Sequence, residues 1–276
     1  MAQLETGVPT AAARQGTTAP SVLVILVTRD GATWLPQCLT ALSRQTHPRL
    51  GVLAIDNGSS DASAEVLESA LGADRVIRRS GQGGFAGALA EALRSDIAGQ
   101  ADYALFLHDD TLLGPEAVGA MVEAAERIER VGVVGPKVLD WEQPRVLREI
   151  GLSTDRFGYP YSPLEDGEID QGQYDRIREV LYVSSCAMLV GRRVLVRIGL
   201  PDERLAPSQE DMDFCWRARL AGFRVLMTPR AEAVHRGATV RGEREGAADR
   251  SRIRYDRERA ALAGILKNYG LLTLAW

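Results

Sequence analysis

Short apolar segments rich in β-branched residues recur through the first half of the chain, and stretches with helical periodicity separate them. Segment 21–28, "SVLVILVT", is apolar almost without interruption, which is typical of a strand buried on both faces. Further strands are predicted over 50–55, 75–79 and 103–107, with helices over 34–42, 62–71 and 85–97. Because parallel neighbours need crossover connections, this alternation predicts an α/β fold with a right-handed, mostly parallel sheet flanked by helices.

The second half of the chain is less regular. Strands are predicted over 131–139, 180–191 and 223–227, and helices over 207–222 and from 251 to the end. The polar, turn-rich stretch 154–179 and the Gly-rich, charged stretch 236–250 predict a mobile excursion and a flexible loop. We therefore expect a disordered tail over 1–20, one folded domain over 21–240, and a loop with a C-terminal helix over 241–276.

The composition is that of a soluble globular protein, with 276 residues and a net charge of −4. This charge gives no reason to expect nucleic-acid binding. The three cysteines are scattered and form no CxxC pair, which favours a reducing compartment. No secretory signal is recognisable in residues 1–20, and "VLVILV" is too short to span a bilayer, so we expect a cytoplasmic protein.

Polar residues follow three of the predicted strands where each strand ends. They are Thr28 and Arg29, Asp56 and Asn57, and the run His108, Asp109 and Asp110. Ligands of parallel sheets bind beyond the carboxyl ends of the strands, so these residues predict a binding site. The run 108–110 is either a solvated turn before a helix or a site for a hard cation such as Mg²⁺ or Mn²⁺.

A second acidic group lies at the start of the helix predicted over 207–222. Ser208 as N-cap with acids in the first turn is ordinary helix-start chemistry, and Asp213 can pair with Arg217. Glu210, Asp211 and Asp213 together nevertheless exceed what a cap requires. His235, which follows a strand-like segment, is either a surface residue or a ligand.

The turn "GQGGFAG" at 81–87 is rich in glycine and lies between a predicted strand and a predicted helix. It contains G-x-G-x-x-A, which is close to a dinucleotide-binding fingerprint, but the acid expected at the end of the next strand is absent there. The alternatives are a tight turn for a close helix–strand approach, or a backbone wall against a bound nucleotide that includes Gly83 and Gly84.

Taken in order over about residues 21–240, these segments resemble the family 2 inverting glycosyltransferases, and their rhamnosyl- and galactofuranosyl-transferase-like branch above all. The resemblance implies the GT-A fold of nucleotide-diphospho-sugar transferases, with a Rossmann-like sheet. Five stretches carry it: "VLVILVTRDGATWLPQCLTALSRQTH", "VLAIDNGSSDAS", "GGFAGALAEAL", "LFLHDD", and "SSCAMLVGRR" through "SQEDMDFCWR" to "AVHRGA".

The resemblance also implies a role for each candidate residue. Asp211 would be the catalytic base, and Asp110, His235 and His108 would be metal ligands for Mn²⁺ or Mg²⁺. The nucleotide sugar would be bound by Thr28, Arg29, Asp56, Asn57, Gly83, Gly84, Asp109 and Glu210. The chain departs from the pattern at His108, where many members have an Asp, and at Gln82, where an Asn is common.

The function expected from the resemblance is metal-dependent, inverting transfer of a sugar from a nucleotide-diphospho-sugar to a hydroxyl of a cell-surface polysaccharide or lipid-linked acceptor. The alternatives are a nucleotide-sugar-binding module without turnover and a sugar-phosphate nucleotidyltransferase. Segment 251–276 begins with basic residues and ends apolar with Trp276, so it either packs on the domain or lies at the inner face of a membrane.

Overall fold

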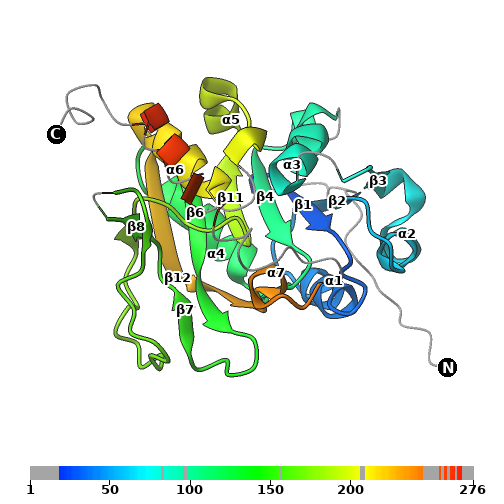
Figure 1. Ribbon diagram of the computed structural model, residues 1–276, viewed down its shortest axis with the longest axis horizontal. Coiled ribbons are helices and arrows are strands. Elements are labelled where there is room, and N and C mark those ends of the chain that lie inside the picture. The colour runs from blue at the N-terminus through cyan, green and yellow to red at the C-terminus, as the bar shows by residue number, and fades with distance from the viewer. Residues whose placement is uncertain are drawn as a thin grey trace.

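The computed structural model describes residues 19–81, 84–95, 98–155, 157–205 and 209–244. Of the C-terminal segment it describes Tyr255, Glu258, Arg259, 262–264 and 266–268. The tail predicted over 1–20 thus lies almost wholly outside the described residues. A ten-stranded sheet runs through the molecule, with strand order β10-β12-β6-β11-β4-β1-β2-β3, and with β5 paired to β12 and β7 paired to β6 (Figure 1).

The first half of the chain forms the parallel part of the sheet. Its elements are β1 (Val22–Thr28), α1 (Leu35–Ser43), β2 (Leu50–Asp56), α2 (Ser63–Leu71), β3 (Val76–Arg78), α3 (Gly84–Arg94) and β4 (Tyr103–His108). Strand β1 lies between β2 and β4 and is parallel to both. The prediction of a mostly parallel sheet built from alternating strands and helices is therefore confirmed.

The second half adds strands in both directions. Its elements are β5 (Thr111–Leu113), α4 (Ala117–Arg127), β6 (Val131–Asp140), β7 (Leu147–Glu149), β8 (Ser153–Thr154), β9 (Pro160–Tyr161), β10 (Arg178–Glu179), β11 (Ala187–Gly191), α5 (Arg192–Ile198), α6 (Glu210–Leu220), β12 (Arg224–His235) and α7 (Ala238–Arg241). Single 3₁₀ turns cover Ala73–Arg75, Ala98–Gln100 and Glu203–Leu205. Strand β11 is antiparallel to β4 and β6, whereas β12 is parallel to β6.

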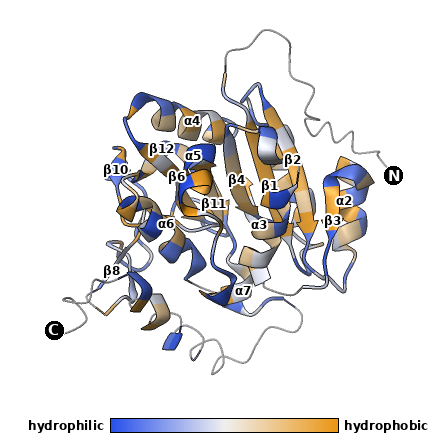
Figure 2. Ribbon diagram, turned by 90° about the horizontal axis from the view of Figure 1, so that it is seen from above, coloured by the Kyte–Doolittle hydropathy of each residue, from blue (hydrophilic) through white to orange (hydrophobic). Residues whose placement is uncertain are grey.

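Helices cover both faces of the sheet. Successive residues of β1 point to opposite faces, so Val24 and Leu26 pack with α1, α2 and α4, while Leu23, Ile25 and Val27 pack with α3 and α6. All seven residues of β1 are buried, as are all seven of β2. Figure 2 shows the mostly hydrophobic central strands of this three-layer arrangement.

Three sequence predictions need correction. The strand predicted over 180–191 is limited to Ala187–Gly191, because the backbone of Val180 and Tyr182 bonds to isolated partners, Val225 and Leu152, rather than to a ladder. The helix predicted over 207–222 begins at Glu210 behind Gln209, which makes no side-chain cap; Ser208 lies outside the described residues. The loop predicted over 236–250 contains the short helix α7.

The acidic excursion over 154–179 is tied to the sheet by one lysine. Lys137 on β6 is only 3% exposed. Its ammonium nitrogen lies 2.6 Å from a carboxylate oxygen of Asp170 and 3.0 Å from one of Asp175. A buried ammonium group needs such partners, so the excursion supplies the counter-charges for this lysine.

The described part of the C-terminal segment is helical and packs on α6. Gly264 is buried, and a side chain there would contact Gln209 and Met212. Lys267 and Asn268 both donate hydrogen bonds to the carboxylate of Asp213, which is fully buried and also accepts from Arg217. Among the described residues, no helix combines the length and the apolar character needed to cross a bilayer.

Asp213→Asn should lower the free energy of unfolding by about 3 kcal/mol, because two cations then lose their buried partner. Chemical denaturation of the two proteins measures this difference. Asp74→Asn removes a carboxylate that is 82% exposed in its pair with Arg75 and should change stability by less than about 1 kcal/mol. Equal stability of wild type and Asp213→Asn would show that Asp213 does not anchor the C-terminal helix.

Candidate active site

The carboxyl ends of β1, β2 and β4 meet at one edge of the sheet. Thr28 is paired in register with Asp56, and its neighbour Val27 with His108. The sequence prediction that these strand ends lie together is therefore confirmed. Thr28, Asp56 and Asn57 are all at most 5% exposed.

Asp109 is buried with two partners from distant parts of the chain. Its Oδ2 accepts a hydrogen bond from Thr28 Oγ1 at 2.5 Å. The guanidinium of Arg244 grips both carboxylate oxygens, with Nη2 2.5 Å from Oδ1 and Nη1 3.0 Å from Oδ2. A Cβ at Gly31 would lie 1.9 Å from Oδ2, so only glycine fits beside this carboxylate.

His108, Asp110 and His235 form a cluster whose ligand atoms all lie within 4.8 Å of one another. Asp110 Oδ2 accepts a hydrogen bond from the backbone N–H of Ala238 at 2.8 Å, which fixes the carboxylate. Its Oδ1 lies 3.3 Å from His235 Nε2 and 3.9 Å from His108 Nδ1. Burial lowers the pKa of His108 to about 3, which leaves its imidazole neutral and able to act as a ligand.

The cluster fits a divalent cation. Asp110 Oδ1 and His235 Nε2 are buried and have no hydrogen-bond partner among the described residues, which is costly unless something else satisfies them. Two imidazoles and a carboxylate are ligands that suit Mn²⁺ and similar ions better than Mg²⁺, which prefers oxygen alone. His108, which replaces the Asp of the usual pattern, thus lies among the candidate ligands.

Asp211 lies in the first turn of α6 and is partly exposed. Its Oδ2 accepts a hydrogen bond from the backbone N–H of Ser185 at 3.4 Å. Desolvation raises the pKa of Asp211 to about 8, and the negative charges of Glu210 and Glu149 add to the shift. A carboxylate with a pKa in this range can accept a proton near neutral pH.

The turn 184–186 connects this carboxylate to the histidine cluster. Ser185 Oγ lies 3.4 Å from His108 Nε2, while the N–H of the same residue binds Asp211. Glu149, at the end of β7, accepts a hydrogen bond from the N–H of Ser184 at 2.9 Å and fixes the turn. Sequence reasoning missed Glu149, because a single acid in an irregular region has no distinguishing pattern.

Asn57 holds the glycine-rich turn against the end of β2. Its Nδ2 donates to the carbonyl of Gly84 at 3.1 Å, and its Oδ1 accepts from Arg79 at 2.6 Å. A Cβ at Gly58 would lie 2.9 Å from the backbone of Gly81, so the backbones of these two loop residues approach closely. Gly83 lies outside the described residues.

The loops after β1 and β2 are joined by hydrogen bonds between side chains and backbone. Asp30, with φ of 49°, accepts from the N–H of Ser60 at 2.7 Å, and its own N–H donates to Ser59 Oγ at 2.9 Å. Asp56 Oδ1 accepts from the N–H of Ser59 at 3.3 Å. Arg29 is the exposed member of the predicted group, with a side chain that is 61% exposed.

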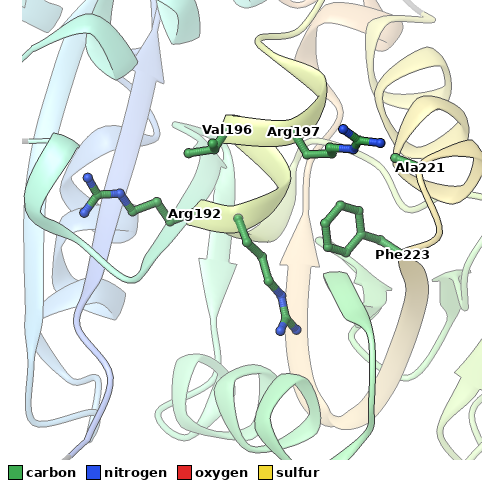
Figure 3. Close-up of a pocket in the computed structure, with 6 residues that line it drawn as sticks. Arg192, Val196, Arg197, Ala221 and Phe223 are labelled. Atoms are coloured by element: carbon green, nitrogen blue, oxygen red, sulfur yellow. The ribbon is translucent and has the colours of Figure 1, made fainter.

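A hollow of about 690 Å³ lies elsewhere, beside α5 (Figure 3). It is lined by Arg192, Arg193, Val196, Arg197, Ala221 and Phe223. Gly191, which precedes α5, pairs with Tyr103 at the amino end of β4, whereas the histidine cluster lies at the carboxyl end. The lining contains no carboxylate or imidazole, so the acid–base and metal-binding groups lie at the other edge of the sheet.

Known proteins share both the sequence and the fold of this chain. The model of the glycosyltransferase like family 2 matches residues 19–258. An N-acetylglucosaminyl-diphospho-decaprenol L-rhamnosyltransferase of Mycobacterium tuberculosis is 25% identical over 236 residues, which cover 79% of this chain and 77% of the relative. The O-antigen biosynthesis protein RfbC of Myxococcus xanthus is 27% identical over 229 residues, covering 80% of this chain and 18% of the relative.

Solved structures with the same fold are glycosyltransferases of the GT-A type. GalNAc-T7 with UDP, GalNAc and Mn²⁺ superposes with a TM-score of 0.65 at 14% identity, over 79% of this chain and 43% of that one. The mannosyltransferase PcManGT of Pyrobaculum calidifontis, with GDP-Man and Mn²⁺, gives 0.56 at 18% identity, over 94% and 79%. S. aureus TarS 1–349 with UDP gives 0.57 at 16% identity, over 90% and 66%.

The expected fold is therefore confirmed, with α-helices on both faces of a mainly parallel sheet and its candidate site at the carboxyl ends of the strands. The family match covers most of the chain and includes the strand ends, the start of α6 and His235. The chain belongs to glycosyltransferase family 2 and has the GT-A fold.

Proposed function

We propose that this glycosyltransferase moves a sugar, with inversion at the anomeric carbon, from a nucleotide-diphospho-sugar to a hydroxyl of a cell-surface polysaccharide or lipid-linked acceptor. We further propose that the reaction depends on Mn²⁺ or Mg²⁺. The rhamnosyltransferase relative is named for a diphospho-decaprenol-linked acceptor, which supports an acceptor of this class.

One observation carries the proposal: Ser185 connects a candidate base to a candidate cation site. Its N–H binds Asp211, and its hydroxyl lies 3.4 Å from His108. Inversion by a single displacement needs one group to accept the proton of the attacking hydroxyl and one to stabilise the departing diphosphate. The two groups lie on either side of this one residue.

Asp211 is the proposed base. An acceptor hydroxyl beside Asp211 would lose its proton to the carboxylate as its oxygen attacks the anomeric carbon. Desolvation, with a smaller contribution from the charges of Glu210 and Glu149, raises the pKa of Asp211 to about 8, so the carboxylate is a stronger base than an ordinary aspartate. Because one displacement completes the transfer, no covalent intermediate with the protein is needed.

The donor is proposed to lie against the strand ends. The residues proposed to contact it are Thr28, Arg29, Asp56, Asn57, Gly83, Gly84, Asp109 and Glu210. Within this group, Asn57 already uses both atoms of its amide to hold the glycine-rich turn, so its contribution is to position the backbone of that turn.

His108, Asp110 and His235 are the proposed metal ligands. A divalent cation bound there would supply positive charge to the diphosphate as it leaves. The orphaned Asp110 Oδ1 and His235 Nε2 support this assignment. His108 stands where many family members have an Asp, which favoured a module that binds without turnover. That argument is weakened because the imidazole of His108 lies in the same cluster as Asp110 and His235.

Family membership argues against the nucleotidyltransferase alternative, since the family model that matches describes glycosyl transfer. The presence of a partly exposed carboxylate with a raised pKa argues against a module that binds without turnover, because a binding module has no need of a base.

We also propose that the outer face of the C-terminal helix contacts the cytoplasmic face of a membrane. Tyr255, Leu262 and Leu266 are 65%, 62% and 69% exposed, and their spacing of seven and four residues places them on one helical face. Gly264 and Asn268 lie on the side that packs on α6. An apolar outer face next to basic residues is typical of an interfacial helix.

The metal prediction is tested by calorimetric titration with UDP, GDP and dTDP. The nucleotide that binds should lose at least about tenfold in affinity when EDTA replaces Mn²⁺, and Asp110→Ala should lose as much with Mn²⁺ present. His47→Ala changes a histidine that bonds to the carbonyl of Pro20 and should bind as wild type does. Equal affinity with and without Mn²⁺ would contradict metal dependence.

Asp211→Asn should reduce turnover by about 10²–10⁴-fold while nucleotide affinity stays nearly unchanged, because the amide cannot accept the proton. Turnover is measured as the release of nucleoside diphosphate, with the sugar nucleotide that binds to the wild-type protein as the donor. Near-wild-type turnover would remove Asp211 from the mechanism.

The pH profile gives a second readout of the same base. Because the pKa of Asp211 is raised to about 8, the carboxyl is protonated below that pH, and turnover should fall as the pH drops below about 8. Glu149→Gln removes a negative charge that raises this pKa, so the profile should move to lower pH, while the amide oxygen of the variant can still accept from Ser184. A profile identical to that of the wild type would show that Glu149 has no electrostatic effect on the base.

The membrane contact predicts salt-sensitive co-sedimentation with vesicles that contain anionic lipid. The double substitution Leu262→Glu and Leu266→Glu should abolish it, because both side chains lie on the exposed face. Val196→Glu changes a residue on α5 that is 79% exposed and serves as the matched control. A wild-type chain that stays in the supernatant at low salt would contradict the proposal.

A further inference from the structure

Arg244 occupies the polar centre of the site, although it follows α7 in a stretch for which the sequence predicted only a flexible loop. Its side chain is 14% exposed. Its Nε donates to Thr239 Oγ1 at 3.0 Å, Nη1 donates to the carbonyl of Arg29 at 2.5 Å, and both terminal nitrogens bind Asp109. The guanidinium also lies over the ring of Trp34, with 5.0 Å to its centroid.

This guanidinium is also next to the candidate cation site. Arg244 Nη2 lies 3.7 Å from Asp110 Oδ1, the same oxygen that lies 3.3 Å from His235 Nε2. Asp109 and Asp110 are adjacent carboxylates that are each 1% exposed. Two buried negative charges need compensating positive charge. Arg244 is the described residue that lies within salt-bridge distance of both carboxylates, and His235 also stabilises the charge of Asp110.

A divalent cation held by Asp110 would therefore be placed close to a positive guanidinium. At such a distance like charges in a buried site repel strongly, so the free cation and Arg244 compete for the same pair of carboxylates. A diphosphate removes the conflict, because it carries enough negative charge for both cations. Its oxygens also match the planar fork of a guanidinium, which binds phosphate through paired hydrogen bonds.

We propose that Arg244 makes cation binding depend on the donor: it neutralises Asp109 and Asp110 in the free enzyme and binds the diphosphate of the nucleotide sugar in the loaded one. This inference rests on the proposed function. The guanidinium of Arg244 exchanges one anionic partner, the carboxylates, for another, the diphosphate. Arg244 therefore stays positively charged throughout. Arg244 is then a ligand of the leaving diphosphate. It also sets the order of binding, because the site binds the divalent cation only weakly until the nucleotide sugar is present.

Two other described arginines near the site are held by partners of their own. Arg79 is committed to Glu91 and Asn57, with nitrogen–oxygen distances of 2.6 Å to each. Arg241 on α7 binds Asp140 Oδ2 at 2.9 Å. Arg241→Gln is therefore a matched control, since it removes the same charge from a position three residues away without touching Asp109.

The test is calorimetric titration of the full chain with Mn²⁺ alone, and then with UDP, GDP and dTDP in saturating Mn²⁺. In Arg244→Gln, the affinity for Mn²⁺ alone should rise by about tenfold, equivalent to about 1.4 kcal/mol. The affinity for the nucleoside diphosphate should fall by about tenfold or more, since a charge-assisted pair is lost. Arg241→Gln should match the wild type in both titrations, and Arg244→Lys should lie between wild type and Arg244→Gln.

The outcomes separate this inference from the proposed function. If Arg244→Gln binds Mn²⁺ and nucleotide as Arg241→Gln does, the inference is overturned. If Mn²⁺ binding is unchanged but nucleotide binding weakens, the competition between cations is overturned and Arg244 is only a phosphate ligand. If none of the three nucleotides binds the wild type, the proposed donor class fails, and the titration with Mn²⁺ alone still decides whether Arg244 competes with the cation.

Discussion

The burial of two adjacent carboxylates at the end of β4 is the constraint on which the site depends. Asp109 and Asp110 are both 1% exposed, and their charges repel each other and resist leaving water. The chain compensates them with groups from two distant parts of the sequence: Thr28 at the end of β1, and the segment that contains His235, the N–H of Ala238 and Arg244. The loop that follows the last strand is thereby brought back to the end of the first.

Burial also affects Asp211, the candidate base of the site, but there it has a different result. Among the described residues Asp211 forms no salt bridge, and its neighbours Glu149 and Glu210 are themselves buried acids. The pKa of Asp211 therefore rises, whereas desolvation at Asp110 is outweighed by its interaction with His235 and by the charge of Arg244, which lower its pKa. Carboxylates a short distance apart in one site thus differ in proton affinity because one has a counter-charge and the other does not.

The parallel half of the fold could be predicted from the sequence because its strands are buried on both faces and its helices have clear periodicity. The positions at which β1, β2 and β4 end could be predicted from these patterns. The prediction that Thr28, Asp56 and His108 lie at one edge of the sheet followed from them. The approach of His235 to Asp110 depends on the pairing of β12 with β5, which no local pattern encodes. Arg244 could not be recognised either, because its neighbours in sequence are Gly and charged residues and its partners in the site, Asp109 and the carbonyl of Arg29, are more than 100 residues away. Segment 180–191 was misjudged because burial alone does not distinguish a strand from an extended segment with isolated bonds.

Gly31 shows that glycines in this chain are required for two different reasons. Gly199 and Gly222 have φ of 76° and 91° with open space where a side chain would begin, so an asparagine, which tolerates that backbone conformation, is an acceptable replacement at either place. At Gly31 the obstacle is volume, because a single carbon would overlap Asp109 Oδ2 at 1.9 Å. No amino acid with a side chain escapes that overlap, whatever its backbone preference. Whether position 31 tolerates a larger residue thus indicates whether the carboxylate of Asp109 is still held in place. A relative with a larger residue at position 31 must place the carboxylate that corresponds to Asp109 differently.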